Sequence, residues 1–206
     1  MISAREALQR LKVGNQRFVS DLGDRSTLND HSRRKELVEG QAPFAIILGC
    51  SDSRVPAELV FDQGLGDLFV IRVAGNIVAS SQIGSVEFAA ERFGTRLVVV
   101  LGHSLCGAVI STLEELQRPG ESQSPNLRSI VNRIRPAVEG LLDTELRQNP
   151  EALLRQAVRA NIRSSVSSLR HGSQILEELI EKEMLWVVGA EYSLETGLVD
   201  FFQGLV

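Results

Sequence analysis

Two short segments of this chain carry side chains whose types and spacing suit metal chemistry. One reads Gly-Cys-Ser-Asp-Ser-Arg over residues 49–54, and the other reads Gly-His-Ser-Leu-Cys-Gly over residues 102–107. Together they hold both cysteines of the chain and one of its three histidines. Two thiolates and one imidazole suit zinc, a borderline-soft ion that favours tetrahedral coordination by nitrogen and sulfur. We therefore predict that Cys50, His103 and Cys106 bind one zinc ion.

Three protein ligands leave the fourth position of a tetrahedral zinc free for water, which distinguishes a catalytic site from a structural one. Water bound in this way has its pKa lowered to about 7 and supplies hydroxide at neutral pH. His103 and Cys106 are three residues apart where a helix is expected to begin, so they share one face. A helix N-terminus also lowers the pKa of a thiol and so favours the thiolate that binds metal.

Asp52 gives the predicted site two alternative forms. It lies two residues after Cys50, so it could occupy the fourth position and close the site. Arg54, two residues further on, could instead grip the carboxylate with two parallel hydrogen bonds and hold it off the metal. In that open form, Asp52 accepts a hydrogen bond from zinc-bound water or hydroxide and orients its lone pair toward a substrate.

Each motif alone is a weak signal, and other interpretations exist. The two cysteines could be buried apolar thiols, or one of them could form a nucleophile pair with His103. Two cysteines around one histidine favour a metal over both. No Lys-Ser/Thr follows the glycines of residues 102–107, so these residues do not form a phosphate-binding loop. The Gly-Leu-Gly segment at 64–66 precedes a predicted strand, whereas the glycines of a dinucleotide-binding motif follow one. The zinc deaminase signature is absent as well.

The elements that must position these residues form an alternating pattern. Four continuous apolar runs have the length of strands covered on both faces: 44–49, 68–73, 97–101 and 185–189. Helical segments are predicted between and after them, at 81–93, 106–117, 126–142 and 150–183. This pattern predicts an α/β fold with a mostly parallel sheet of four strands, flanked by helices. Residues 198–202 follow a turn at 195–197 and are predicted to return as an antiparallel edge strand.

Both motifs come directly after predicted strands, the first and the third. In an open parallel sheet, sites form beyond the carboxyl ends of the strands. If these two strands are neighbours, Cys50 lies near His103 and Cys106.

The N-terminal region is predicted to be helical. Ser3 and Glu6 fit a capping box before an amphipathic helix over residues 4–19, and a short helix is predicted at 33–40 after a polar loop at 21–30. We predict a single domain over residues 1–206, with a helical arm at 1–40 and a zinc-binding α/β core at 41–206.

Composition argues against several classes of partner. The net charge is -4 and aromatic residues make up 5%, so neither electrostatics nor stacking favours nucleic-acid binding. No apolar stretch has the length of a membrane span, and residues 1–18 do not form a secretory signal. We expect a cytoplasmic protein.

The motifs together resemble those of the β-class carbonic anhydrases. Beyond the two site segments, the similarity covers residues 14–18, 62–69, 72–76, Tyr192 and residues 196–197, in order along nearly the whole chain. The resemblance implies reversible hydration of carbon dioxide to bicarbonate and a proton, by attack of hydroxide on one zinc per subunit. It also implies that Asp52 and Arg54 form a catalytic dyad, with Asp52 a possible ligand. Gln41 matches a substrate-binding glutamine, and Phe69 matches an apolar pocket wall. For Phe69, a residue of the strand core is the nearly equal alternative.

The resemblance is to the plant-like subtype. The bacterial subtype with a non-catalytic bicarbonate site carries Trp where this chain has Ile47. Plant enzymes have Tyr where Phe88 stands, and many members have Gly where Ala108 stands. The family is typically dimeric, with its N-terminal helix lying across the partner subunit, so the resemblance implies a homodimer or a dimer of dimers. An ordinary helix packed within its own chain is the alternative.

Two further functions remain open. The same scaffold and ligands could hydrolyse carbonyl sulfide or carbon disulfide, because zinc hydroxide attacks similar linear electrophiles. A closed zinc site with Asp52 as permanent fourth ligand would serve structure alone.

Overall fold

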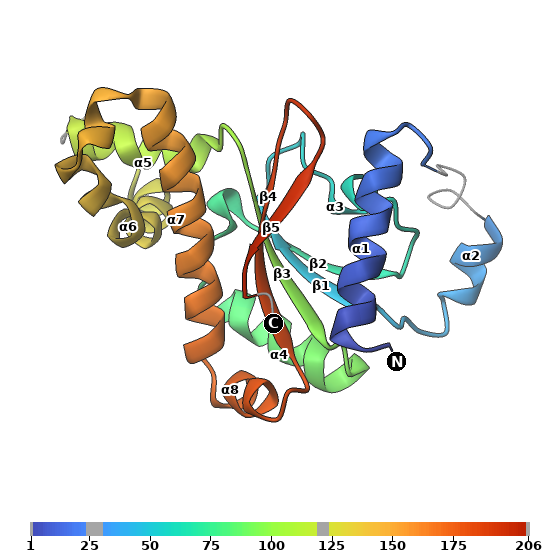
Figure 1. Ribbon diagram of the computed structural model, residues 1–206. Helices are drawn as coiled ribbons and strands as arrows, with labels where there is room; N and C mark the ends of the chain where they lie inside the picture. The colour runs from blue at the N-terminus through green and yellow to red at the C-terminus, as the bar shows by residue number, and fades with distance from the viewer. Residues whose placement is uncertain (1, 24–30, 119–123, 205–206) are drawn as a thin grey trace.

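The computed structural model describes residues 2–23, 31–118 and 124–204, which form one sheet with helices on both faces (Figure 1). The sheet has five strands in the order β2-β1-β3-β4-β5. Their bounds are β1 Ala45–Gly49, β2 Leu68–Arg72, β3 Leu97–His103, β4 Trp186–Tyr192 and β5 Val199–Gln203. The first four are parallel to one another and β5 is antiparallel to β4. The predicted sheet, including its antiparallel edge strand, is confirmed.

Alternate residues of β1 enter two separate cores, which explains why its sequence does not alternate between apolar and polar. Ile46 and Leu48 pack against the helices on one face, while Ala45 and Ile47 pack with those on the other. All four side chains are fully buried. A strand covered on both faces must be apolar at every position.

The helices cover both faces of the sheet. The face that holds Ile46 and Leu48 is covered by five helices: α4 Ser80–Phe93, α5 Gly107–Gln117, α6 Pro125–Val138, α7 Pro150–His171 and α8 Gln174–Glu181. The other face is covered by α1 Ala4–Val19 and α3 Ala57–Val60, and a short α2 spans His31–Glu36. The described residues also include the 3-10 turns η2 Ala74–Asn76, η3 Glu139–Asp143 and η4 Glu145–Gln148. None of the helices in the described ranges is long and apolar enough to cross a membrane.

Three predicted helices end earlier than expected. The one predicted at 33–40 is α2, which begins at His31 and ends at Glu36. The helical segment predicted at 150–183 is divided at Gly172, because the Ser173 hydroxyl accepts a hydrogen bond from the Leu176 N–H and begins a new helix. The helix predicted at 126–142 ends at Val138 and continues as the tighter turn η3. The predicted loop at 21–30 lies mostly outside the described residues.

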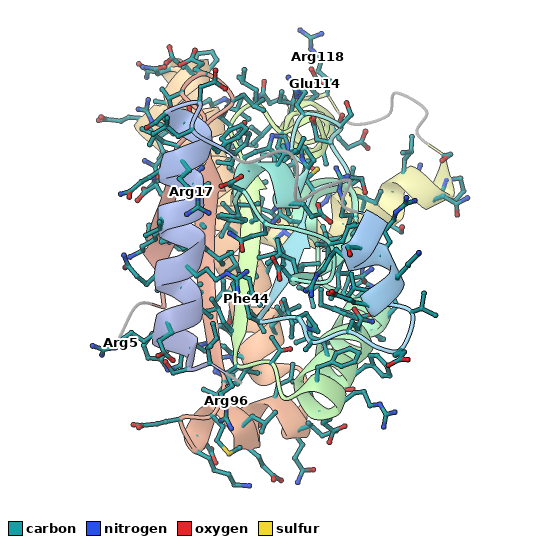
Figure 2. All side chains as sticks on the ribbon, turned by 90° about the vertical axis from the view of Figure 1, so that its right-hand side faces the viewer. Arg5, Arg17, Phe44, Arg96, Glu114 and Arg118 are labelled. Carbon is teal, nitrogen blue, oxygen red and sulfur yellow. The ribbon has the colours of Figure 1, made fainter. Side chains whose placement is uncertain are left out.

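The N-terminal helix packs against its own chain. Ala7 and Leu11 of α1 are fully buried in the core on that face of the sheet. Asn15 ties α1 to two other elements, because its amide donates to the carbonyls of Val60 and Gly197. In the side view of Figure 2, α1 runs along the sheet with Arg17 near its upper end. The apolar face that the resemblance assigned to a partner subunit is therefore covered within the chain.

Candidate metal centre

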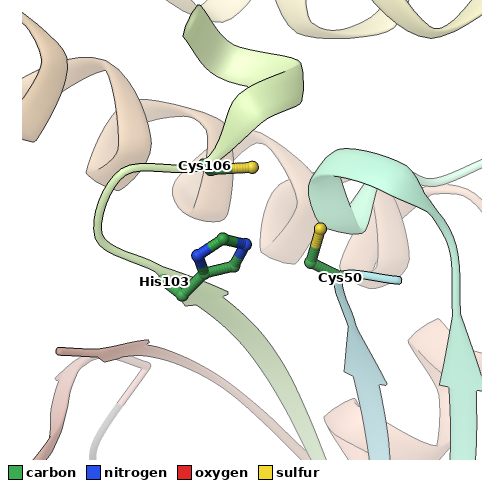
Figure 3. Close-up of side chains that lie close together, drawn as sticks. All are labelled: Cys50, His103 and Cys106. Carbon is green, nitrogen blue, oxygen red and sulfur yellow. The ribbon is translucent and has the colours of Figure 1, made fainter. Parts of the chain in front are cut away.

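The topology brings the two sequence motifs together at one edge of the sheet. Strands β1 and β3 are neighbours, with Gly49 paired to Leu101, so Cys50 and His103 both lie at the carboxyl ends. Cys106 is the N-cap residue of α5, which begins directly afterwards. The ligand atoms of Cys50, His103 and Cys106 all lie within 4.8 Å of one another (Figure 3). The sequence placed these three residues in one cluster, and the structure does the same.

The imidazole of His103 has one nitrogen free to bind a metal. Its side chain is fully buried, and Nδ1 lies 2.9 Å from the carbonyl oxygen of Ser104. A carbonyl oxygen can only accept a hydrogen bond, so Nδ1 carries the proton and Nε2 keeps its lone pair. Nε2 is buried and has no hydrogen-bond partner. A buried lone pair without a partner is costly, and a metal ion in the cluster would satisfy it.

The two cysteine thiols cannot ionise independently. The pKa of Cys50 is lowered, chiefly because the Cys106 thiol donates a hydrogen bond to its sulfur, while burial opposes the shift. The pKa of Cys106 is raised, because it gives that hydrogen bond and because burial disfavours a second thiolate. A cation bound between the two sulfurs removes the conflict by stabilising both thiolates. The donor set therefore fits a metal ion, and two sulfurs with one nitrogen fit zinc.

The two sulfurs lie in different surroundings. Cys106 is at the N-terminus of α5, where the N–H groups of Ala108 and Val109 act to lower its pKa, but its sulfur accepts no capping hydrogen bond from that helix. Cys50 follows a strand and has no helix of its own. Its sulfur accepts a hydrogen bond from the Gly75 N–H at 3.3 Å.

Asp52 is held by Arg54 beside the cluster. The Arg54 Nε and Nη2 atoms donate to Oδ1 at 2.9 Å and to Oδ2 at 2.7 Å, and the Arg54 N–H donates to Oδ1 at 3.0 Å. These hydrogen bonds hold the pKa of Asp52 well below its ordinary value, against the opposing effect of burial. Oδ2 still lies 3.8 Å from the His103 Nε2. The structure thus has the carboxylate in its arginine-bound form, adjacent to the predicted metal ligands.

Arg72 is a residue to which sequence reasoning gave no role, although it lies in a motif that carries the resemblance. It ends β2, in register with Gly49. Its Nε donates to the carbonyl of Cys50 at 3.0 Å, and its Nη2 donates to the carbonyl of Asp52 at 2.6 Å. Two arginines therefore hold the first motif, Arg72 through the main chain and Arg54 through the Asp52 carboxylate. The sequence signal that could have indicated this role is a basic residue, Arg72, at the end of the strand next to β1.

Gln41 and Phe69 do not join the cluster within one chain. Gln41 is exposed and lies before the amino end of β1, whereas Cys50 follows its carboxyl end. Phe69 is in register with Ile46, four residues from Cys50, or roughly 13 Å along a strand. Its ring contacts those of Phe88 and Phe93 on α4.

The fold and the cluster define an α/β protein with a buried site of two cysteines and one histidine, suited to a metal ion. A family model described as carbonic anhydrase matches residues 45–199. The chain is 38% identical over 192 residues to carbonic anhydrase 2 of Mycobacterium tuberculosis, covering 93% of this chain and 89% of that protein. It is 37% identical to a carbonic anhydrase of Mycolicibacterium smegmatis, covering 94% of this chain and 91% of that protein.

Solved structures of β-carbonic anhydrases share the fold of this chain. The β-carbonic anhydrase CcaA superimposes with a TM-score of 0.76 at 27% identity, covering 98% of this chain and 93% of that chain. One of two tetrameric β-carbonic anhydrases from Sordaria macrospora has a TM-score of 0.73 at 24% identity, covering 82% of this chain and 85% of that chain. This chain belongs to the β-class carbonic anhydrase family.

We predict that His103→Ala removes bound metal, because the cluster loses its only nitrogen ligand. Metal analysis of purified protein should give about one zinc per wild-type chain and a small fraction of that in the variant. His171→Ala is the matched control, since His171 is exposed and its Nδ1 likewise lies 2.9 Å from a main-chain carbonyl, that of Ser167. Equal zinc content in the two variants would contradict the assignment of His103.

Proposed function

We propose that this protein catalyses the reversible hydration of carbon dioxide to bicarbonate and a proton, with one zinc ion per subunit held by Cys50, His103 and Cys106. The observation that carries the proposal is the buried cluster of three ligand atoms within 4.8 Å, with a carboxylate held by arginine beside it. Membership in the β-class carbonic anhydrase family and relatives named carbonic anhydrase at 37–38% identity support it.

The chemistry divides between the metal and the chain. Zinc supplies a Lewis acid that lowers the pKa of a water molecule to about 7, so that hydroxide is available at neutral pH. The chain supplies two negative thiolates and one neutral imidazole, which offset the charge of the ion. Burial of all three ligands, at 5% exposure or less, limits water around them.

Asp52 and Arg54 orient the reacting water. With the Arg54 guanidinium bound to both of its oxygens, the Asp52 carboxylate stays ionised and is fixed beside His103. A carboxylate has about four acceptor sites, so Asp52 can accept a further hydrogen bond from the reacting water. That bond points the remaining lone pair of the oxygen toward the carbon of the substrate. Because Arg54 is always charged, it stabilises the carboxylate without entering the proton transfer.

Gln41 and Phe69 remain proposed substrate contacts, and they imply a second subunit. Neither reaches the cluster of its own chain, so each would contact substrate only in the site of another copy. A related fungal enzyme is described as tetrameric, and we propose a homodimer or dimer of dimers here. We also propose that residues 1–206 act as a single domain and that the protein works in the cytoplasm, where its two free thiols stay reduced.

Stopped-flow measurement of carbon dioxide hydration tests the proposed reaction. We expect zinc-loaded protein to hydrate carbon dioxide, with a rate that rises between pH 6 and 9 as the reacting water ionises. Zinc-loaded protein that hydrolyses carbonyl sulfide or carbon disulfide but leaves carbon dioxide unchanged would overturn the substrate assignment. Zinc-loaded protein inert on all three would indicate a structural site instead.

Replacing Asp52 separates its role from metal binding. We expect Asp52→Asn to keep its zinc while kcat/KM falls by about 10²- to 10⁴-fold, because the reacting water loses its acceptor. Asp67→Asn is the control, since Asp67 also pairs with an arginine, Arg10, at 2.9 Å and has a similarly buried side chain. Asp67 precedes β2 and so lies at the amino ends of the strands, whereas Asp52 lies at the carboxyl ends. Loss of zinc from Asp52→Asn would show that Asp52 is a ligand, and unchanged kcat/KM would remove it from the mechanism.

A further inference from the structure

Two polar side chains are buried on the face of α7 that packs against the sheet. Asn161 and Ser165 are 2% and 4% exposed and lie four residues apart, among the buried apolar residues Val158, Ile162 and Val166. A helix face packed into an apolar core gains nothing from polar groups unless they make specific hydrogen bonds. Both do: Asn161 Nδ2 donates to the Gly75 carbonyl at 2.8 Å, and Ser165 Oγ donates to the Asn76 carbonyl at 2.9 Å.

The two acceptors belong to the turn η2, which contacts the cluster. Gly75 and Asn76 both have left-handed backbone conformations, with φ values of 71° and 44°. Such consecutive conformations are unfavourable for an isolated chain, above all at a non-glycine residue. The turn is also tightly enclosed, since a Cβ atom at Gly75 would lie 2.8 Å from Ile134 Cδ1 and 3.0 Å from Ala108 Cβ. Hydrogen bonds from α7 satisfy two buried carbonyls that the left-handed turn leaves without helical partners.

The hydrogen bonds from α7 hold the turn η2, and this fixes the position of the Gly75 N–H. The Gly75 N–H donates to the Cys50 sulfur, and Figure 3 shows the cluster in which that sulfur lies. Cys106 differs, because it is the N-cap residue of α5 and lies directly at a helix N-terminus. Cys50 follows a strand, and its donor must come from a separate segment held at the right distance. An N–H group that donates to a thiolate disperses its charge and fixes its direction toward a bound metal.

We propose that Asn161 and Ser165 are positioning residues for the Cys50 thiolate, acting through the Gly75 amide. The inference rests on the proposed function, because it takes Cys50 as a metal ligand. The three hydrogen bonds form a continuous path from α7 through η2 to the sulfur. Loss of either side chain leaves a buried carbonyl without its partner, releases the turn, and weakens the hold of Cys50 on the metal.

The test compares Asn161→Ala and Ser165→Ala with Thr95→Val. Thr95 is the matched control, because it is 4% exposed and its hydroxyl donates to the Pro43 carbonyl at 2.8 Å, in the loop that precedes β3 at the other end of the sheet. Two measurements are made on each protein: the rate of zinc transfer to a chelator, and the thiolate-to-metal absorption band of the cobalt-substituted form. Urea unfolding of the metal-free proteins measures the purely structural cost.

We expect all three variants to be destabilised to a similar degree. Only the two α7 variants should release zinc faster, by about 10- to 100-fold, and show a shifted thiolate-to-cobalt band. Ser165→Thr, which keeps the hydroxyl, should restore both metal readouts toward wild type. If Asn161→Ala fails to fold, the Ser165 pair of variants decides the matter.

The outcomes separate this inference from the proposed function. Metal readouts in the α7 variants that match Thr95→Val would overturn the positioning role and leave the zinc site intact. Wild-type protein that binds neither zinc nor cobalt would overturn both.

Discussion

The structure depends on the close approach of two sulfur atoms in a buried site. Cys50 and Cys106 lie together with His103 in the interior, and without a cation the second thiolate is opposed by both burial and the first. A metal ion would turn this arrangement from a cost into a binding site, since its charge stabilises both thiolates and it accepts the lone pair of the His103 Nε2. The parallel neighbours β1 and β3 bring the predicted ligands together, and Cys106 lies at the N-terminus of α5.

Around this cluster, charged and polar side chains hold the main chain of the loop after β1 and of the short turn η2. Arg54 fixes the Asp52 carboxylate, Arg72 fixes the carbonyls of the same segment, and the polar pair on α7 fixes the turn η2. Each group is satisfied by hydrogen bonds, as a buried polar network must be if it is to rigidify a site. Rigid surroundings matter here because the Asp52 Oδ2 lies 3.8 Å from the His103 Nε2, and Asp52 stays off the predicted metal position only while it is bound to Arg54. In the structure the carboxylate is held by Arg54, which is the arginine-bound form of the two predicted forms.

Sequence patterns predicted the ligands and the sheet, because both follow from local rules. Apolar runs of strand length fixed the order of elements, and the carboxyl-edge rule then placed Cys50 near His103 and Cys106. Contacts that depend on tertiary packing were beyond the same reasoning. Apolar periodicity in α1 could not tell whether its face is covered by this chain or by another copy. The roles of Asn161 and Ser165 could not be predicted either, because their acceptors are more than 80 residues away in the sequence. Gln41 and Phe69 were assigned by resemblance, which carries no information on which subunit they serve.

The most direct test of the central claim is X-ray absorption at the zinc edge on purified protein. We predict a first shell of two sulfur atoms at about 2.3 Å and two nitrogen or oxygen atoms at about 2.0–2.1 Å. One of the light atoms is the His103 nitrogen, and the other lies in the fourth position. A spectrum without sulfur, or with a single sulfur, would contradict the account, as would protein that contains no zinc after growth and purification with the metal supplied.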